Sequence, residues 1–163
     1  FVPGDPEKIL ALLEAADIKR LIMPLPHDTE MLDALAENRI DSALSNSVEG
    51  SAGCKRRFVS LAAKFACSAV FNPVNFVRAN EKPFLQSWRI GRFIKNIGQL
   101  DIVDATWNLC STRLARGNAE IKELISILRC HHFSGFFTLG GGAVYPGDLK
   151  QAVQDFSDLL DNM

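Results

Sequence analysis

The 163-residue sequence lacks the features that mark several large classes of protein. It has no uninterrupted apolar run of ~18 residues, the length a membrane-spanning helix needs, and it opens with no basic-then-apolar signal segment. Its four cysteines form no Cys-x-x-Cys pair, so neither a zinc ribbon nor a thioredoxin-like site is indicated. We therefore expect a soluble cytoplasmic protein with reduced cysteines and no contact with a membrane.

An excess of positive charge is also lacking. The 18 basic and 19 acidic residues are interspersed, and the formal net charge is -1. The densest basic cluster, Lys55 to Arg57, is only three residues long, so nothing predicts nucleic-acid binding. A hydrophobic content of 47% is ample for one compact core. We expect residues 1–163 to form a single domain.

What the sequence does contain is a regular alternation of short apolar runs with amphipathic stretches. Five runs predict strands, over residues 18–25, 41–48, 68–71, 99–105 and 135–139. Six helices are expected between and around them: one opened by Asp5-Pro6, one over about 28–38, one marked by Phe58 to Phe65, one from Pro83 to Ile97, one capped by Asn118, and one opened by Asp148 with Gln151.

Apolar residues at helical spacing indicate which face of each helix meets the core. They are Ile9, Leu12, Leu13 and Ala16; Met31, Leu32 and Leu35; Phe58, Leu61, Ala62 and Phe65; Ile121, Leu124, Ile125 and Leu128; and Leu149, Val153, Phe156 and Leu160.

The strict alternation predicts an α/β fold with right-handed crossovers and a parallel sheet. A closed eight-stranded barrel usually needs roughly 200 residues or more, so five strands should not close one. Either the sheet is open or another segment supplies the missing edge. In either case a ligand site is expected at the carboxyl ends of the strands.

Four segments, in order, resemble the xylose isomerase-like TIM barrels, the superfamily of sugar isomerases, sugar-phosphate epimerases and endonuclease IV-like proteins. Residues 43–46 (ALSN) resemble its apolar-Glu-Asn strand end, and 71–76 (FNPVNF) resemble its Asp-Pro-x-Asn turn. Residues 97–105 (IGQLDIVDA) resemble its Ile-Gly-His-x-His-x-Lys-Asp strand. Residues 116–118 through 135–137 resemble the closing Gly-x-Gly helix and Gly-apolar strand. The resemblance implies a partial or shortened TIM barrel that lacks the first strands.

The same resemblance implies where a metal would be held. Metal-dependent members hold a divalent ion with Glu, Asp, His and Glu at four strand ends, and here those positions carry Ser45, Asn72, Asp101 and Gly140. One carboxylate cannot replace the lost anionic ligands, so we expect no metal cofactor unless ligands come from elsewhere. The carboxylate proton shuttle is lost as well. Glu49 is the acid best placed to restore some function.

The remaining acid/base candidates are Asp101 and Asp104. They lie three residues apart, so they face opposite sides of the sheet unless the strand has ended by Asp104. Candidate substrate-binding residues are Ser45, Asn46, Asn72, Asn75, Trp107, Gly140 and Gly141. Trp107 could stack on a ligand ring. The glycines predict a flexible loop more readily than a phosphate cradle.

Other reactive side chains have simpler interpretations. His131 and His132 are expected at a helix end, where imidazoles meet the negative end of the helix. His27 could face a pocket but has no partner acid at a motif spacing, and Cys110 has no neighbouring base in the sequence.

Together these features predict a protein of sugar or sugar-phosphate isomerase or epimerase descent that binds a small polyol, or acts without catalysis, after losing its metal chemistry. One alternative is an active metal-dependent isomerase completed by another segment or chain. The other is a structural protein that assembles through an open sheet edge, for example as a homo-oligomer.

Overall fold

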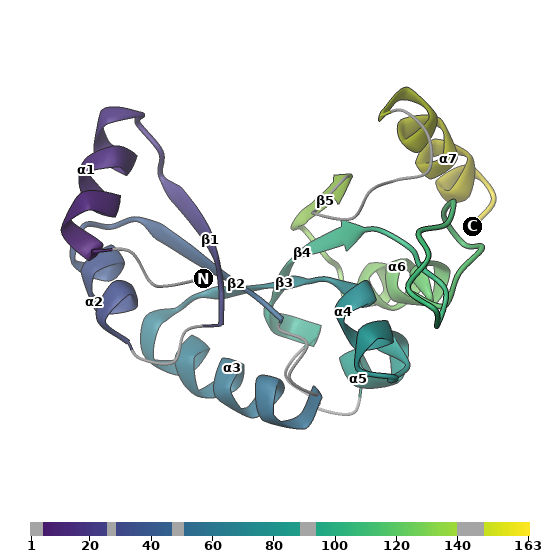
Figure 1. Cartoon of the computed structure of the whole chain (residues 1–163), viewed down its shortest axis with the longest axis horizontal. Helices are drawn as coiled ribbons and strands as arrows, with labels where there is room; N and C mark the ends of the chain where they lie inside the picture. The colour runs from purple at the N-terminus through teal and green to yellow at the C-terminus, as the bar shows by residue number, and fades with distance from the viewer. Residues whose placement is uncertain (1–4, 26–28, 47–50, 89–93, 140–148) are drawn as a thin grey trace.

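The computed structural model describes residues 5–25, 29–46, 51–88, 94–139 and 149–163. Its centre is one parallel sheet in the order β1-β2-β3-β4-β5. The sheet curls into a half-barrel (Figure 1), so the predicted partial TIM barrel is confirmed. The strands are Arg20–Pro24, Asp41–Ser45, Ser68–Phe71, Ile97–Ile102 and Phe136–Leu139.

Seven α-helices lie within the described residues, one more than predicted. They are α1 Pro6–Ala15, α2 Glu30–Glu37, α3 Ser51–Phe65, α4 Pro73–Arg78, α5 Pro83–Trp88, α6 Ile121–Cys130 and α7 Leu149–Asp161. The additional helix is α4, which Asn72 caps by accepting a hydrogen bond from the Asn75 amide, with Pro73 in the first turn.

The predicted helix from Pro83 to Ile97 was wrong at its end. Within the described part of this stretch, residues 83–88 form α5, Ile94–Asn96 form a short 3-10 turn, and β4 already begins at Ile97. Gly98 explains the close strand packing there, because a Cβ at this position would lie 2.8 Å from the Cβ of Ser68. The same strand ends at Ile102, before the expected Ala105.

Side chains alternate between the two faces of the sheet. One face packs against the helices in the hydrophobic core and carries Met23, Leu44, Ala69, Phe71, Leu100 and Ile102. The strand pairing places a second set on the opposite, concave face: Arg20, Ile22, Ala43, Ser45, Ser68, Val70, Gln99, Asp101, Phe136 and Thr138. Polar residues on the concave face are concentrated at β4 and at the strand ends.

Helix capping agrees with the sequence at one end of the chain and not in the middle. Asp5 caps α1 by accepting a hydrogen bond from the Glu7 amide at 3.1 Å. The predicted Asn118 cap of α6 was wrong: the helix begins after Glu120, whose φ of 51° is left-handed, and Asn118 bonds elsewhere. His131 follows the last residue of α6, as predicted. Asp148 lies outside the described residues.

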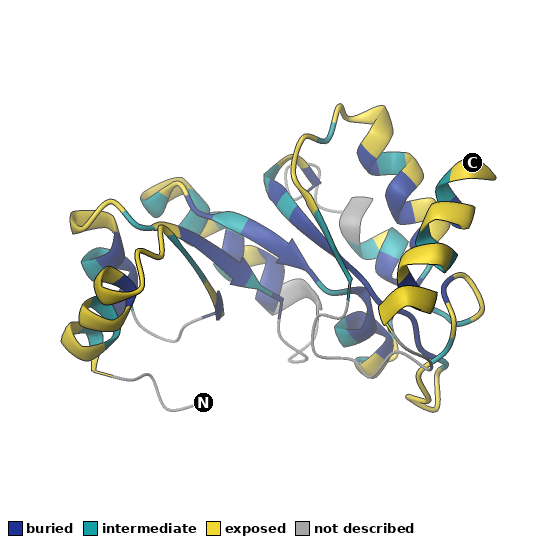
Figure 2. Ribbon diagram, turned by 90° about the horizontal axis from the view of Figure 1, so that it is seen from above, coloured by how far each residue is buried: buried dark blue, intermediate teal, exposed yellow. Residues whose placement is uncertain are grey.

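Helices in the middle of the chain bury most of the predicted apolar faces, whereas the two outermost helices bury only part of theirs: Leu13 of α1 is buried, and Phe156 and Leu160 of α7 pack against the core. Met31, Leu32 and Leu35 of α2 are buried, as are Phe58 of α3 and the predicted face of α6. In contrast, Leu12 of α1 and Leu149 and Val153 of α7 are exposed, which corrects the prediction. α1 packs against α2 at one end of the sheet and α7 packs against β5 at the other, and exposed residues are frequent at both ends of the molecule in Figure 2.

No helix in the described part of the chain is long and apolar enough to span a bilayer. All four cysteines are free thiols, with Cys54 and Cys67 buried and Cys110 and Cys130 exposed.

Candidate functional site

A connected set of polar side chains lies at the carboxyl ends of β2, β3 and β4. It consists of Asn46, Asn72, Asn75, Gln99 and Asp101, which we call the strand-end network. The Asn46 amide bonds the Asn72 backbone twice: its Oδ1 accepts from the Asn72 N–H at 2.6 Å and its Nδ2 donates to the Asn72 carbonyl at 2.9 Å. Two neighbouring strand ends are therefore held in a fixed register.

Asn75 connects the network to the first turn of α4. Its Nδ2 donates to the Asn46 carbonyl at 2.7 Å, and its backbone N–H donates to the Asn72 Oδ1 at 3.3 Å. The predicted binding residues Asn46, Asn72 and Asn75 are thus brought together. Asn72 and Asn75 are half-buried.

Asp101 is the acid of this network and is only 6% exposed. Its Oδ2 accepts from Asn72 Nδ2 and its Oδ1 accepts from Gln99 Nε2, each at 3.1 Å. Burial raises the pKa of Asp101 above its ordinary value, and the hydrogen bonds from Gln99 and Asn72 oppose that rise. A carboxyl group with a raised pKa is better suited to carry a proton than an ordinary aspartate.

Gln99 was not among the predicted site residues. Period-two alternation could have identified it, because residues two apart on a strand share a face, and Gln99 precedes Asp101 by two. Gln99 lies inside β4 rather than at its end, so the search for strand-end residues did not include it.

Asp104 belongs to a different environment, since β4 has ended before it. Its Oδ1 accepts from the N–H groups of Ala105 and Ala119, and its Oδ2 accepts from those of Arg116 and Gly117. This carboxylate holds the segment 103–120, which we call the β4 loop. Both oxygens are occupied by backbone donors, an arrangement suited to positioning the loop; an acid/base role for Asp104 stays a prediction.

Trp107 lies in the β4 loop and does not join the strand-end network. Trp107 is 42% exposed and lines a pocket of about 340 Å³ together with Lys82, Asp104, Gly117, Asn118 and Glu120. The predicted binding residues therefore separate into two places, the strand-end network and this pocket.

The other predicted residues contribute less to the described site. Ser45 is half-buried at the end of β2, where its Oγ donates to the Met23 carbonyl at 3.4 Å. Glu49, Gly140, Gly141 and His27 lie outside the described residues. Exposed Cys110 has its Sγ 3.9 Å from the Asn108 carbonyl oxygen.

The residues around Asp101 do not fit a divalent metal. Hard cations need several anionic oxygens, and the two side chains that bond Asp101 are carboxamides that present N–H donors to it. Within the described ranges, no three His, Cys, Asp or Glu side chains gather in an arrangement that could hold an ion.

No protein-family model and no curated protein sequence matches the chain. Several solved structures resemble it, among them three that are each 12% identical and cover 96% of this chain. A xylose isomerase domain protein from Planctomyces limnophilus superposes with a TM-score of 0.68, a xylose isomerase domain-containing protein from Salmonella typhimurium LT2 with 0.60, and 3-keto-D-glucoside 4-epimerase from E. coli with 0.61.

The chain spans 62%, 66% and 69% of these three structures, respectively. The fold resemblance inferred from the strand-end motifs is therefore confirmed, although the neighbours are longer. The described chain has the fold of part of a xylose isomerase-like TIM barrel.

Proposed function

We propose that this protein binds a small sugar or polyol at the strand-end network, as a domain of sugar isomerase or epimerase descent that does not use a metal held by its strand ends. The observation that carries the proposal is the position of Asp101, a buried carboxyl on the concave face whose two oxygens are aligned by amides. One structural neighbour is a sugar epimerase by name, which supports this class of ligand.

The chemistry of the network suits hydroxyl groups. Carboxamides offer both donors and acceptors, and an alcohol can use both at once. Asn72 and Asn75 are partly accessible beside Asp101, and half-buried Ser45 and Thr138 lie on the same concave face. Convergent neutral polar groups above an apolar floor, here Ala43 and Val70, are typical of small-molecule sites.

A direct test is calorimetric titration with xylitol and D-fructose, with and without Mn²⁺. We expect binding that is independent of Mn²⁺ and is weakened by Asp101→Asn. The matched control is Asp41→Asn, since Asp41 is exposed at the amino end of β2, far along the strands from the network. Ketose isomerisation that requires Mn²⁺ or Mg²⁺ would instead support an active enzyme completed by another segment or chain.

A second candidate function is assembly through the sheet edges. Ile22 on β1 and Phe136 on β5 are exposed, and so are Leu149 and Val153 on α7. Unpaired edges that carry apolar side chains favour association with further strands. We propose a second copy of this chain as the partner.

Free thiols at all four cysteines support a reducing, cytoplasmic location.

A further inference from the structure

The pocket beside Trp107 lies between the β4 loop and the start of α6. Its walls come from three segments: the β4 loop, the first turn of α6, and Lys82 in the connection between α4 and α5. None of the strand-end network side chains lines it. Its volume of about 340 Å³ is within the range of ~300–1,000 Å³ common for small-molecule sites.

The β4 loop is held in one conformation although it is not a helix or strand. Asp104 accepts hydrogen bonds from four backbone N–H groups of the loop. Asn118 adds two more bonds: its backbone N–H donates to the Ala105 carbonyl at 2.7 Å, and its Oδ1 accepts from the Trp107 N–H at 3.0 Å. The backbone that carries the indole is therefore preorganised.

Gly117 shows how tightly this loop is packed. A Cβ at Gly117 would lie 2.2 Å from the Asp104 Oδ1 and 2.6 Å from the Ala105 carbonyl oxygen. Such tight packing around a loop whose tryptophan stays 42% exposed is unusual for a purely structural segment, because an aromatic side chain stabilises a fold mainly when it is buried.

The charges of the pocket nearly cancel. Asp104 directs both oxygens at backbone donors, which leaves Lys82 and Lys122 against Glu120 and Glu123. Glu120 is oriented by the Phe84 N–H, which donates to its Oε2 at 2.8 Å. A balanced set of charged and amide groups around an aromatic face favours neither an anion nor a cation.

We propose that this pocket binds a neutral pyranose sugar, with one face of the ring stacked on Trp107 and its hydroxyl groups toward Lys82, Asn118 and Glu120. A pyranose combines an apolar C–H face with a polar rim, and the pocket presents the complementary pattern. This site is separate from the strand-end network, so the inference goes beyond the function proposed above.

Tryptophan fluorescence tests the inference, since the chain has only two tryptophans, Trp88 and Trp107. In a Trp88→Phe background, methyl β-D-glucopyranoside should change the Trp107 emission saturably over the millimolar range. Xylitol, which has no ring face, should have little effect. Trp107→Ala should weaken glucopyranoside binding, measured by NMR, about threefold to tenfold, as expected for loss of aromatic stacking. Trp107→Phe should recover part of the affinity.

Leu109→Ala is the matched control, because Leu109 is also an exposed apolar residue of the same loop and does not line the pocket. The inference is overturned if the emission does not change, if Trp107→Ala binds as tightly as the parent, or if Leu109→Ala weakens binding as much as Trp107→Ala. Asp101→Asn separates the two proposals: it should reduce xylitol binding at the strand-end network and leave the Trp107 response intact.

Discussion

Two aspartates three residues apart show how the local backbone decides what a carboxylate does. Asp101 is still in β4, so its side chain lies on the concave face among carboxamides. Asp104 follows the end of the strand and turns into the β4 loop, where backbone N–H groups surround it. The first environment leaves a carboxyl group suited to binding or proton transfer, and the second stabilises a loop.

The role of Asp104 predicts a large effect of a small change. Asp104→Asn replaces one acceptor oxygen by an NH₂ group that must face backbone N–H donors. We expect a loss of about 1–3 kcal/mol in the free energy of unfolding, the usual cost of unsatisfied buried donors. Urea denaturation measures it, and exposed Asp161→Asn on α7 is the control. Equal midpoints for the two variants would show that the loop does not depend on this carboxylate.

The raised pKa of Asp101 predicts a pH dependence of stability. Because its pKa is higher in the folded than in the unfolded protein, the folded state takes up the proton first as the pH falls. The contribution of Asp101 to stability should therefore increase as the pH falls through the folded pKa and decrease as it rises. Urea denaturation of the parent and of Asp101→Asn, from about pH 7 to about pH 4, isolates this contribution because other carboxylates cancel in the difference.

The predicted result is a parent that gains stability relative to Asp101→Asn as the pH is lowered. A difference that is constant with pH would show that the hydrogen bonds from Asn72 and Gln99 balance the effect of burial, and a change in the opposite direction would show that they outweigh it.

At the scale of residues, the sequence predicted which polar groups stand at strand ends but not how they pair. Asn46, Asn72 and Asp101 follow from the strand boundaries and from parallel pairing. The bonds of Asp104 to Arg116 and Ala119 span more than ten residues of loop, and no periodicity encodes them. The prediction that Asn118 caps α6 was wrong for the same reason, because its side chain accepts a hydrogen bond from the backbone N–H of Trp107.

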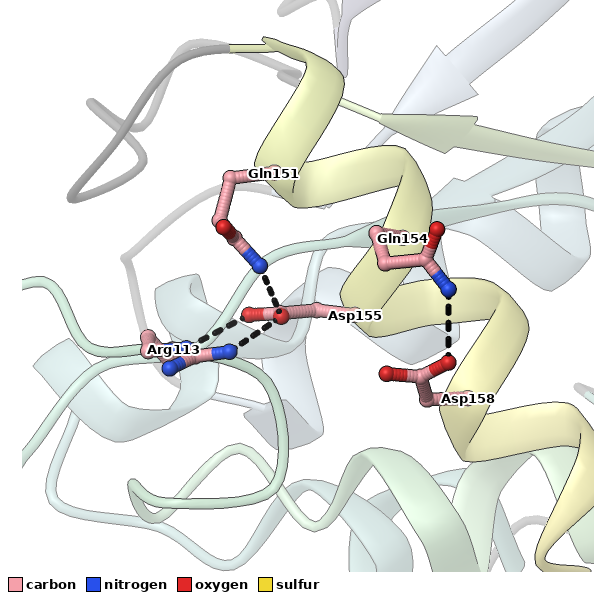
Figure 3. A network of polar contacts seen from close by, with 5 residues as sticks. All are labelled: Arg113, Gln151, Gln154, Asp155 and Asp158. Carbon is pink, nitrogen blue, oxygen red and sulfur yellow. Dashed lines mark hydrogen bonds and ion pairs between the residues drawn. The ribbon is translucent and has the colours of Figure 1, made fainter.

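Among the elements, α7 is held by a paired interaction with the β4 loop (Figure 3). The Arg113 guanidinium donates to both oxygens of Asp155, with a distance of 2.8 Å from Nε to Oδ2, and Gln151 Nε2 also donates to Oδ1 at 2.8 Å. The Asp155 side chain is only 7% exposed, although Arg113 is 60% exposed. This contact joins the last helix to the segment that carries Trp107.

Loss of the two hydrogen bonds between the Arg113 guanidinium and Asp155 should weaken the attachment of α7 to the β4 loop. Arg113→Lys keeps the charge but cannot bond both oxygens of Asp155 in the same plane. We expect the free energy of unfolding to fall by about 1 kcal/mol. The loss is smaller than for a fully buried ion pair because solvent screens the exposed Arg113. Amide hydrogen exchange in α7 should become about fivefold faster. Gln154→Ala, which removes an exposed bond to Asp158 on the same helix, should have little effect. Equal exchange rates in both variants would contradict the prediction.

Helical periodicity predicted the apolar face of α7 but not whether that face is covered. Leu149 and Val153 of the predicted face are exposed, whereas Phe156 and Leu160 of the same face pack against the core beside buried Ala152 and Leu159. Amphipathicity reports that a face is apolar; the neighbours that cover it depend on the rest of the sheet. At the edge of this sheet the described chain supplies a neighbour on one side only.

At the scale of the whole molecule, the described strands form an open sheet with two edge strands, β1 and β5. β1 and β5 each pair with one neighbour among the described strands, and the curl brings Arg20 of β1 to within 5.0 Å of the Phe136 ring centroid of β5. The strand count was predictable from the sequence, because alternation and turn residues mark each strand. Curvature was not, since it arises from strand twist and from packing over the whole sheet.

Phe136 tests whether the edges mediate assembly. Its ring is 60% exposed on an edge strand, and such strands avoid pairing when they carry charge. If copies associate through β5, Phe136→Lys should shift the protein toward monomer, because it removes an apolar contact and places a second cation near Arg20. Light scattering over a range of concentrations measures the change, with circular dichroism to verify folding.

Leu85→Lys is the matched control, since Leu85 is also exposed but lies on α5, away from both edge strands. Association that falls in Phe136→Lys and persists in Leu85→Lys would locate the contact at the edge. Equal loss in both variants would indicate nonspecific attraction between apolar surfaces. A parent protein that stays monomeric at every concentration would remove assembly as a function, because open edges that do not pair with each other need a different partner or none.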